Sequence, residues 1–246
     1  MTKVIVINSS PKMKHGTGAL LLAPFIEGME EEKAEVELVH LQKLDLKTCI
    51  GCMNCWFRTP GICSSLKDEM SELLDKMIQA DYWILSTPIY AGGVSTNLKI
   101  LMERTLPIVE PMLDDDIEHC VHLQRTGYGK SKVVLFATAG LLMEEFHPAV
   151  CHLESYCRLS GKEFVNAVLR PQAGMFKRQV LNDPVKVEDI LSASKQAGRQ
   201  LIKEGKISEE TLATISREFM SLEEFRKIYN RNTRNMIERG SIRNVR

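Results

Sequence analysis

Short apolar runs alternate with stretches of helical periodicity along the first 170 residues of the chain. Residues 3–8 (KVIVIN) form a continuous β-branched run, which is typical of a parallel strand buried on both faces. Comparable runs predict further strands at residues 35–41, 82–87, 132–137 and 163–169. Apolar residues at helical spacing predict helices at residues 19–29, 66–78, 95–106 and 144–159. The second of these helices has Ser65, with Asp68 three residues on, as its expected N-cap.

This alternation of strand and helix predicts an α/β domain built on a parallel sheet. Crossovers between parallel strands are right-handed, so helices are expected on both faces of a doubly wound sheet. Residues 107–131 form an insert before the fourth strand, with an acidic patch and a run of small residues. After Pro184 the pattern becomes wholly helical, with Ser208 and Ser221 as expected caps. We therefore predict one domain at residues 1–180, with a cysteine-rich loop at 49–63, and a helical C-terminal extension at 181–246.

The composition excludes several classes of protein. The chain has 246 residues, 44% of them hydrophobic, and its 32 basic residues balance 32 acidic ones. A net charge of zero argues against a protein that depends on nucleic acid or on an acidic membrane surface. No apolar run approaches the roughly 20 residues of a membrane span, and the first residues lack the pattern of a signal peptide, so we expect a cytoplasmic protein. Residues 226–246 hold seven basic residues and one acidic residue, which predicts either a docking arm for nucleic acid or an acidic redox partner, or a tail that clasps a neighbouring subunit.

The loop at residues 9–18 is a candidate anion site. It follows the first strand and precedes the first helix, where backbone N–H groups and the helix dipole attract negative charge. Ser10 and Thr17 add hydroxyls, Lys12 adds a positive charge, and Gly16 lets the backbone come close to a ligand. The loop has neither a G-x-G-x-x-G fingerprint nor a P-loop pattern. It predicts a phosphate cradle, with an ordinary helix-capping turn as the alternative.

A second loop, at residues 87–95, is expected beside the first. It lies at the carboxyl end of the third strand, and ligands of open α/β sheets bind at the point where the strand order reverses. Tyr90, flanked by Pro88 and Ile89, is suited to line a flat aromatic ring, while Gly92 and Gly93 let the backbone contact the edge of that ring. The alternative is a strand-ending turn in which Tyr90 merely packs.

Four of the seven cysteines crowd into residues 49–63. Cys49, Cys52, Cys55 and Cys63 read C-x2-C-x2-C-x7-C, which is a compact four-thiolate set with ferredoxin-like spacing at its start. This spacing favours a [4Fe-4S] cluster over zinc, for which two separated C-x2-C pairs are more usual. A third interpretation is that the thiols are packed or reactive and hold no metal.

These segments together resemble the flavodoxin-like NAD(P)H-dependent FMN reductases and, within them, the iron-sulfur flavoproteins. The matching pieces are SSPKMKHGT, then CIGCMNCWFRTPGIC followed by LKDEM, and ADYWILSTPIYAGGVSTNLKILMER. The resemblance covers roughly residues 1 to 175 and implies a flavodoxin-like five-stranded parallel sheet in the order 2-1-3-4-5, with FMN bound. Three positions depart from the family pattern: Lys12 stands where arginine is usual, Gly16 where asparagine is usual, and Ala91 where a larger residue is usual.

The resemblance also implies roles for individual residues. It carries over the phosphate contacts to Ser10, Lys12 and Thr17. Contacts to the ring and ribityl chain fall on Pro88, Ile89, Tyr90, Gly92 and Ser95. Thr138, Ala139 and Gly140, which follow the fourth strand, are similar to a third cofactor loop. Tyr90 is the one catalytic candidate, because it is placed to shape the surroundings of the ring.

The function implied is that of an oxidoreductase in which FMN performs the redox chemistry and a [4Fe-4S] cluster handles single electrons. NAD(P)H or a reduced ferredoxin is the expected donor, and the resemblance implies a homodimer or homotetramer. One alternative is a cluster-free NAD(P)H-dependent FMN or quinone reductase. Another is a non-enzymatic electron carrier or redox-sensing protein that docks its partners through the basic C-terminal arm.

Overall fold

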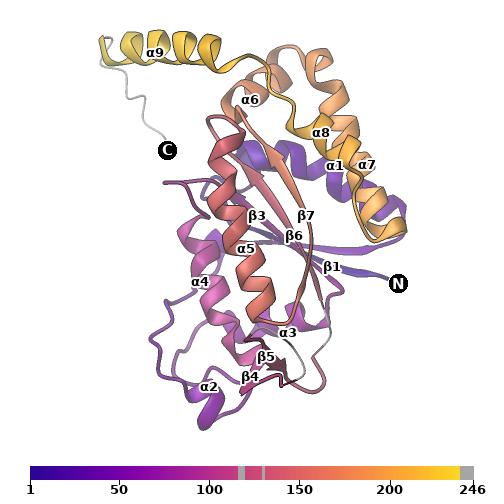
Figure 1. The fold of residues 1–246 in the computed structure, drawn as a ribbon, viewed down its shortest axis with the longest axis vertical. Coiled ribbons are helices and arrows are strands. Elements are labelled where there is room, and N and C mark those ends of the chain that lie inside the picture. Colours follow the sequence, from indigo (N-terminus) through magenta and orange to yellow (C-terminus); the bar gives the residue numbers. More distant parts are fainter. Residues whose placement is uncertain (116–119, 129–130, 239–246) are drawn as a thin grey trace.

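A parallel sheet forms the centre of the molecule in a computed structural model, which describes residues 1–115, 120–128 and 131–238. Within these residues the sheet has five strands in the order β2-β1-β3-β6-β7, and all neighbouring pairs are parallel (Figure 1). The strands are β1 (Lys3–Asn8), β2 (Glu35–His40), β3 (Tyr82–Pro88), β6 (Lys132–Thr138) and β7 (Glu163–Arg170). This is the order 2-1-3-4-5 of the flavodoxin-like fold, so the predicted architecture and sheet order are confirmed.

Helices cover both faces of the sheet, because its central strands are apolar on both sides. One face packs against α1 (Thr17–Glu31) and α7 (Glu188–Glu204). The other face packs against α3 (Met70–Gln79), α4 (Thr96–Arg104) and α5 (His147–Leu159). Figure 1 shows α4 and α5 on one side of the strands and α1 and α7 on the other.

The contact between α1 and α7 is exceptionally close. It depends on two glycines, since a Cβ atom on Gly28 would lie 1.9 Å from the carbonyl oxygen of Lys195, and one on Gly198 would lie 2.1 Å from that of Phe25. Ser194 Oγ also donates to the carbonyl oxygen of Leu21 at 2.7 Å. Helix α7 therefore shares a hydrophobic core with the first helix of the chain. A division of the protein at residue 180 stays a prediction.

The sequence missed two helices and two strands that the structure shows. A short helix, α2 (Asn54–Phe57), lies inside the cysteine-rich loop, and the insert contains an antiparallel hairpin of β4 (Val109–Leu113) and β5 (His122–Gln124). Helix α6 (Ala173–Asn182) follows β7 directly. Part of the insert (116–119 and 129–130) and the end of the extension (239–246) lie outside the described residues.

The prediction that Ser65 caps the next helix was wrong, because α3 begins only at Met70. The hydroxyl of Ser65 accepts a hydrogen bond from the side-chain amide of Asn54 and lies 3.1 Å from Cys52 Sγ. The carboxylate of Asp68 is bound by Arg104, which comes from a distant part of the chain. Ser65 therefore has its partners outside the helix, whereas Asp68 also accepts a hydrogen bond from the N–H of Met70, the first residue of α3, at 3.2 Å.

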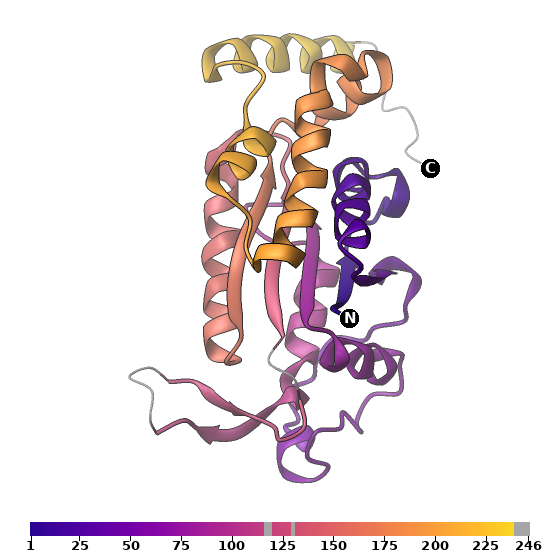
Figure 2. The same ribbon diagram turned by 90° about the vertical axis from the view of Figure 1, so that its right-hand side faces the viewer.

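The predicted helical extension is present and ends away from the sheet. Helix α8 (Glu209–Ser216) packs near β7, and α9 (Leu222–Glu238) lies beyond one end of the sheet in both views (Figures 1 and 2). The hairpin β4–β5 and helix α2 lie at the opposite end. Among the described residues, no helix is both long enough and apolar enough to cross a membrane.

Candidate functional site

A cleft of about 670 Å³, open to solvent, lies at the carboxyl ends of β1, β3 and β6. The three loops singled out in the sequence meet in it, as expected for a parallel sheet at its switch point. Ten of the thirteen residues expected to contact a cofactor line this cleft: Ser10, Lys12, Gly16, Thr17, Pro88, Ile89, Tyr90, Thr138, Ala139 and Gly140. Gly92, Gly93 and Ser95 are outside its lining. The structure thus brings most of the expected residues together, and their contacts to a cofactor stay predictions.

The first loop is built as a cradle around its own polar groups. Asn8 Oδ1 accepts a hydrogen bond from the backbone N–H of Ser10 at 2.9 Å, and Ser10 Oγ accepts one from the N–H of Lys12 at 3.3 Å. Gly16 is the N-cap of α1 and has no side chain with which to cap it, so the helix N-terminus faces the cleft. A Cβ atom on Gly16 would lie 2.8 Å from Ser10 Oγ, so only glycine leaves this space open. The donor set fits a phosphate group.

The second loop turns sharply at Ala91 and Gly92. Tyr90 and Gly93 exchange two backbone hydrogen bonds of 3.0 Å, while Ala91 and Gly92 have φ angles of 48° and 75°. Two successive positive φ values define a type I′ turn, in which glycine is favoured and alanine is strained. The turn presents Tyr90 at the cleft with 52% of its surface exposed. Gly92 and Gly93 thus shape the turn.

Ser95 joins two loops beneath the cleft. It is the N-cap residue of α4 and is 5% exposed. Its hydroxyl donates to Ser9 Oγ at 2.7 Å, and its backbone N–H donates to Thr87 Oγ1 at 2.9 Å. These bonds hold the first loop against the second. The structure therefore gives Ser95 partners within the protein itself.

The N-terminus of α6 forms a side of the cleft that the sequence did not reveal. Ala173 and Gly174 line the cleft, and the N–H of Ala173 donates to the carbonyl oxygen of Ala139 at 2.9 Å. From the same helix, Lys177 Nζ donates to the carbonyl oxygen of His15 at 2.9 Å. Gln172, the N-cap of α6, has a φ angle of 49°. Glutamine is not one of the residues that usually mark the start of a helix. For that reason the sequence carried no usable signal for this wall.

A second hollow, of about 330 Å³, is lined by all four clustered cysteines. Gly51 and Met53 have φ angles of 65° and 55°, so the backbone between the first three cysteines curls around this space. Among the described residues, no three His, Cys, Asp or Glu side chains are grouped so that they would hold one metal ion. The four thiols thus line one pocket of the cysteine-rich loop. All seven cysteines of the chain, each in a described position, are free thiols.

The thiols of the pocket differ in their surroundings. A hydrogen bond with Ser65 lowers the pKa of Cys52, whereas burial, followed by the charge of Cys63, raises the pKa of Cys55. Arg104 Nη2 lies 3.5 Å from Cys63 Sγ. Negative charge is therefore favoured on Cys52 and disfavoured on the buried Cys55.

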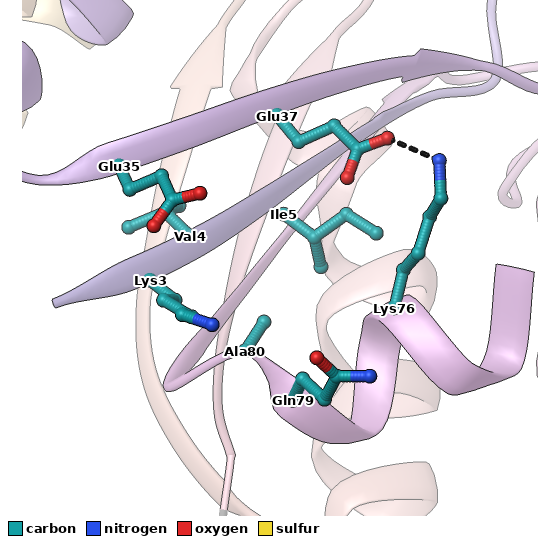
Figure 3. Close-up of a pocket in the computed structure, with 8 residues that line it drawn as sticks. All are labelled: Lys3, Val4, Ile5, Glu35, Glu37, Lys76, Gln79 and Ala80. Atoms are coloured by element: carbon teal, nitrogen blue, oxygen red, sulfur yellow. Dashed lines mark hydrogen bonds and ion pairs between the residues drawn. The ribbon is translucent and has the colours of Figure 1, made fainter.

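Another cavity lies at the opposite, amino-terminal edge of the sheet (Figure 3). Figure 3 shows Glu37 of β2 and Lys76 of α3 facing each other across it in an ion pair of 2.6 Å. Both side chains are about half exposed, so the pair is worth little energetically. Ligand sites of parallel sheets lie at the other edge, so this cavity is not the candidate site.

Fold and cleft together define a flavodoxin-like flavoprotein, and comparison with known proteins identifies the family. Residues 2–162 match the model of the NADPH-dependent FMN reductases, and the chain belongs to this family. The chain is 41% identical over 106 residues to an iron-sulfur flavoprotein of Methanocaldococcus jannaschii, covering 43% of this chain and 53% of that protein. It is 34% identical over 103 residues to an iron-sulfur flavoprotein of Archaeoglobus fulgidus, covering 42% and 48%. The matched segments thus span about half the length of these relatives.

Solved structures resemble the fold at low sequence identity. An FMN-dependent NADH-azoreductase from Bacillus anthracis, in complex with FMN, aligns over 82% of this chain and all of its own, with a TM-score of 0.59 and 16% identity. An NAD(P)H:quinone oxidoreductase from Methanothermobacter marburgensis aligns over 81% of this chain and 96% of its own, with a TM-score of 0.55 and 20% identity. At these identities the likeness shows the fold alone.

Proposed function

We propose that this protein is an FMN-dependent oxidoreductase of the iron-sulfur flavoprotein type. The observation that carries the proposal is the meeting of three loops and two helix N-termini, those of α1 and α6, in one cleft at the switch point of the sheet. Helix N-termini attract anions such as phosphate, and glycine-rich backbone allows a flat ring to come close. Membership of the FMN reductase family supports FMN as the group that occupies this cleft.

The residues of the cleft divide the binding of FMN among them. Ser10, Lys12 and Thr17 would hold the phosphate with the N-terminus of α1. Lysine offers a point charge in place of the bidentate fork of arginine, so the backbone donors carry more of the recognition. When bound, FMN accepts a hydride and releases electrons one at a time. Tyr90 and Ile89 would border the ring and limit its contact with water.

The cysteine pocket would hold a [4Fe-4S] cluster through Cys49, Cys52, Cys55 and Cys63. Four thiolates at this spacing match the chemistry of such a cluster, and all four line the same pocket. The curated relatives are named iron-sulfur flavoproteins, which supports the same assignment. Together the two groups would convert between two-electron and one-electron transfer. The donor would be NAD(P)H, which gives two electrons as a hydride, or a reduced ferredoxin, which gives one electron at a time.

The surroundings of the flavin cleft and of the cysteine pocket bear on whether the protein forms an oligomer. Helix α4 starts directly after its N-cap Ser95, beneath the cleft, and ends at Arg104, behind the cysteine pocket, so it is about 13 Å long. Large apolar side chains are exposed around the pocket, among them Ile50, Phe57 and Ile62 at 64%, 69% and 58%. Exposed apolar groups of this size are typical of interfaces. These features support a homodimer or homotetramer in which the pocket of one subunit lies near another subunit.

A cluster-free NAD(P)H-dependent FMN or quinone reductase is the second candidate. It is favoured by the absence, among the described residues, of three ligand side chains grouped around a single point. In that case the four thiols would be structural or reactive, and electrons would leave directly from the flavin cleft.

The test is the iron, acid-labile sulfide and FMN content of protein purified without oxygen. We expect about four iron, four sulfide and one FMN per chain. Cys49→Ser should lose the iron, while Cys151→Ser, which alters an exposed cysteine outside the pocket, should keep it. FMN without iron would establish the second candidate instead. Absence of FMN under all conditions would refute the assignment of the cleft.

The electron donor is tested on the same preparations. Stopped-flow measurement of flavin bleaching should be made with NADH, with NADPH and with reduced ferredoxin. If the proposal is right, ferredoxin reduces the wild-type protein rapidly and Cys49→Ser slowly. Equal rates in both proteins would show that electrons bypass the cysteine pocket.

A further inference from the structure

The side chain of Arg104 is buried directly behind the cysteine pocket, at the end of α4. Its guanidinium donates to both carboxylate oxygens of Asp68, at 2.5 and 3.0 Å, and to the carbonyl oxygen of Lys47 at 2.7 Å. A further contact runs from Nη2 to Cys63 Sγ, at 3.5 Å. Arg104 therefore touches one expected cluster ligand and also binds the chain just before the first cysteine and just after the last.

This ion pair is fully removed from water. The side chains of Arg104 and Asp68 are each 1% exposed, and the Nε–H of Arg104 has no hydrogen-bond partner in the described part of the chain. Burying two charges is costly, and apolar residues of similar volume often stabilise a fold equally well. Stability alone therefore does not account for a charged pair here. What the pair secures is a positive charge held against a cysteine sulfur.

We propose that Arg104 is a positioning residue that holds Cys63 for a [4Fe-4S] cluster and raises the reduction potential of that cluster, with Asp68 fixing the guanidinium in place. The inference rests on the proposed function, because it requires the cluster. A hydrogen bond to a ligand sulfur and a nearby positive charge both stabilise the more negative, reduced form over the oxidised form.

Arginine is needed at this position because of its shape. The planar guanidinium presents a fork of donors, so it binds the Asp68 carboxylate at two points while Nη2 still faces Cys63 Sγ. Lysine offers one compact ammonium group and cannot make the same set of contacts at once. The conservative replacement Arg104→Lys therefore separates the geometric contribution from the charge.

The experiment compares Arg104→Lys and Arg104→Gln with the wild-type protein. The matched control is Lys99→Gln, which removes an exposed positive charge from the same helix. Iron, sulfide and FMN are measured per chain, and the cluster potential is measured by anaerobic titration followed by electron paramagnetic resonance. We expect Arg104→Lys to keep its FMN and its far-ultraviolet circular dichroism. The equilibrium constant for reducing its cluster should fall about tenfold, which lowers the reduction potential by about 59 mV for one electron.

Arg104→Gln should show a larger shift or lose at least half of its iron, again with FMN retained. Lys99→Gln should match the wild-type protein. The inference is overturned if both Arg104 variants keep wild-type iron content and potential. It is equally overturned if both lose FMN and helical content together with iron, since Arg104 would then be a general structural residue. A wild-type protein that takes up no iron even after anaerobic reconstitution would refute the proposed function itself, and this inference with it.

Discussion

Replacing Gly198 with alanine tests the packing of the C-terminal half of the chain against the first helix. A Cβ atom at this position would lie 2.1 Å from the carbonyl oxygen of Phe25, whereas ordinary contact begins near 3.4 Å. Helices α1 and α7 would have to separate by about 1.3 Å, because a backbone carbonyl within a helix cannot rotate away. The side chains between them, including Leu21, Phe25 and Leu201, are fully buried.

The expected loss of stability follows from that separation. A gap of 0.5–1 Å already forfeits a quarter to a half of a dispersion contact, and overpacked cores lose about 1–3 kcal/mol. We expect the upper end, about 3 kcal/mol, because several large side chains share the contact. For a chain of this size that loss lowers Tm by roughly 9 °C.

The assay is guanidinium and thermal unfolding followed by circular dichroism. Ser192→Ala is the matched control, because it adds no atom and changes an exposed position of the same helix. It should leave Tm within about 2 °C of the wild-type value. The reasoning would be refuted if the free energy of unfolding of Gly198→Ala lay within about 1 kcal/mol of the wild-type value. A single transition is expected in each protein, whereas two separate transitions would support independent folding units on either side of residue 180.

Three further predictions concern the cleft, the ion pair and the C-terminal segment. Gly16→Ala places a methyl group 2.8 Å from Ser10 Oγ. Fluorescence titration of the apoprotein should then show an FMN dissociation constant raised at least about tenfold, while the Tm of the protein without FMN stays unchanged. Hydrogen bonds from the guanidinium lower the pKa of Asp68 to about 2, so its stabilisation is complete above about pH 4 and is lost as the pH falls from 4 towards 2. Asp68→Asn should therefore be about 2 kcal/mol less stable at pH 6 in guanidinium unfolding, and a difference that stays constant down to pH 2.5 would contradict this. The fully buried side chain of Arg170 donates to the carbonyl oxygens of Pro171, Ile215 and Arg217. In Arg170→Met these bonds are lost, so limited proteolysis should cleave residues 215–220 at least about tenfold faster than in the wild-type protein. An unchanged cleavage rate would count against the role of these bonds.

The sheet was predictable because each of its strands is encoded locally. A strand buried on both faces needs a continuous apolar run, and such runs mark residues 3–8, 82–87 and 132–137 to within one residue of the observed strands. The handedness of crossovers then restricts the order of parallel strands. The three cofactor loops follow from this topology, since the carboxyl ends of parallel strands share one edge.

Other features depend on residues that are distant in the sequence. Ser65 does not cap α3, because its hydroxyl is bound to Asn54 and Cys52 in the cysteine-rich loop. Asp68 is bound by Arg104, 36 residues further along the chain, and no local pattern reveals that partner. Helix α6 was missed because its N-cap residue, Gln172, makes no capping hydrogen bond with its side chain. That residue bonds to distant residues instead: its N–H donates to the carbonyl oxygen of Leu141, and its side-chain oxygen accepts from the N–H of Phe219. Its N-terminus completes the cleft only because the end of β7 lies beside the end of β6.

The sequence by itself determined the fold class, the place of the cleft and the four cysteines that share a pocket. Each of these depends on local periodicity or close spacing, and local interactions are encoded in neighbouring residues. Tertiary structure alone decided the close crossing of α1 with α7, the α6 wall of the cleft and the burial of Arg104 against Cys63. These features join residues far apart in the chain, and their energies come from packing and desolvation that arise only when those residues meet.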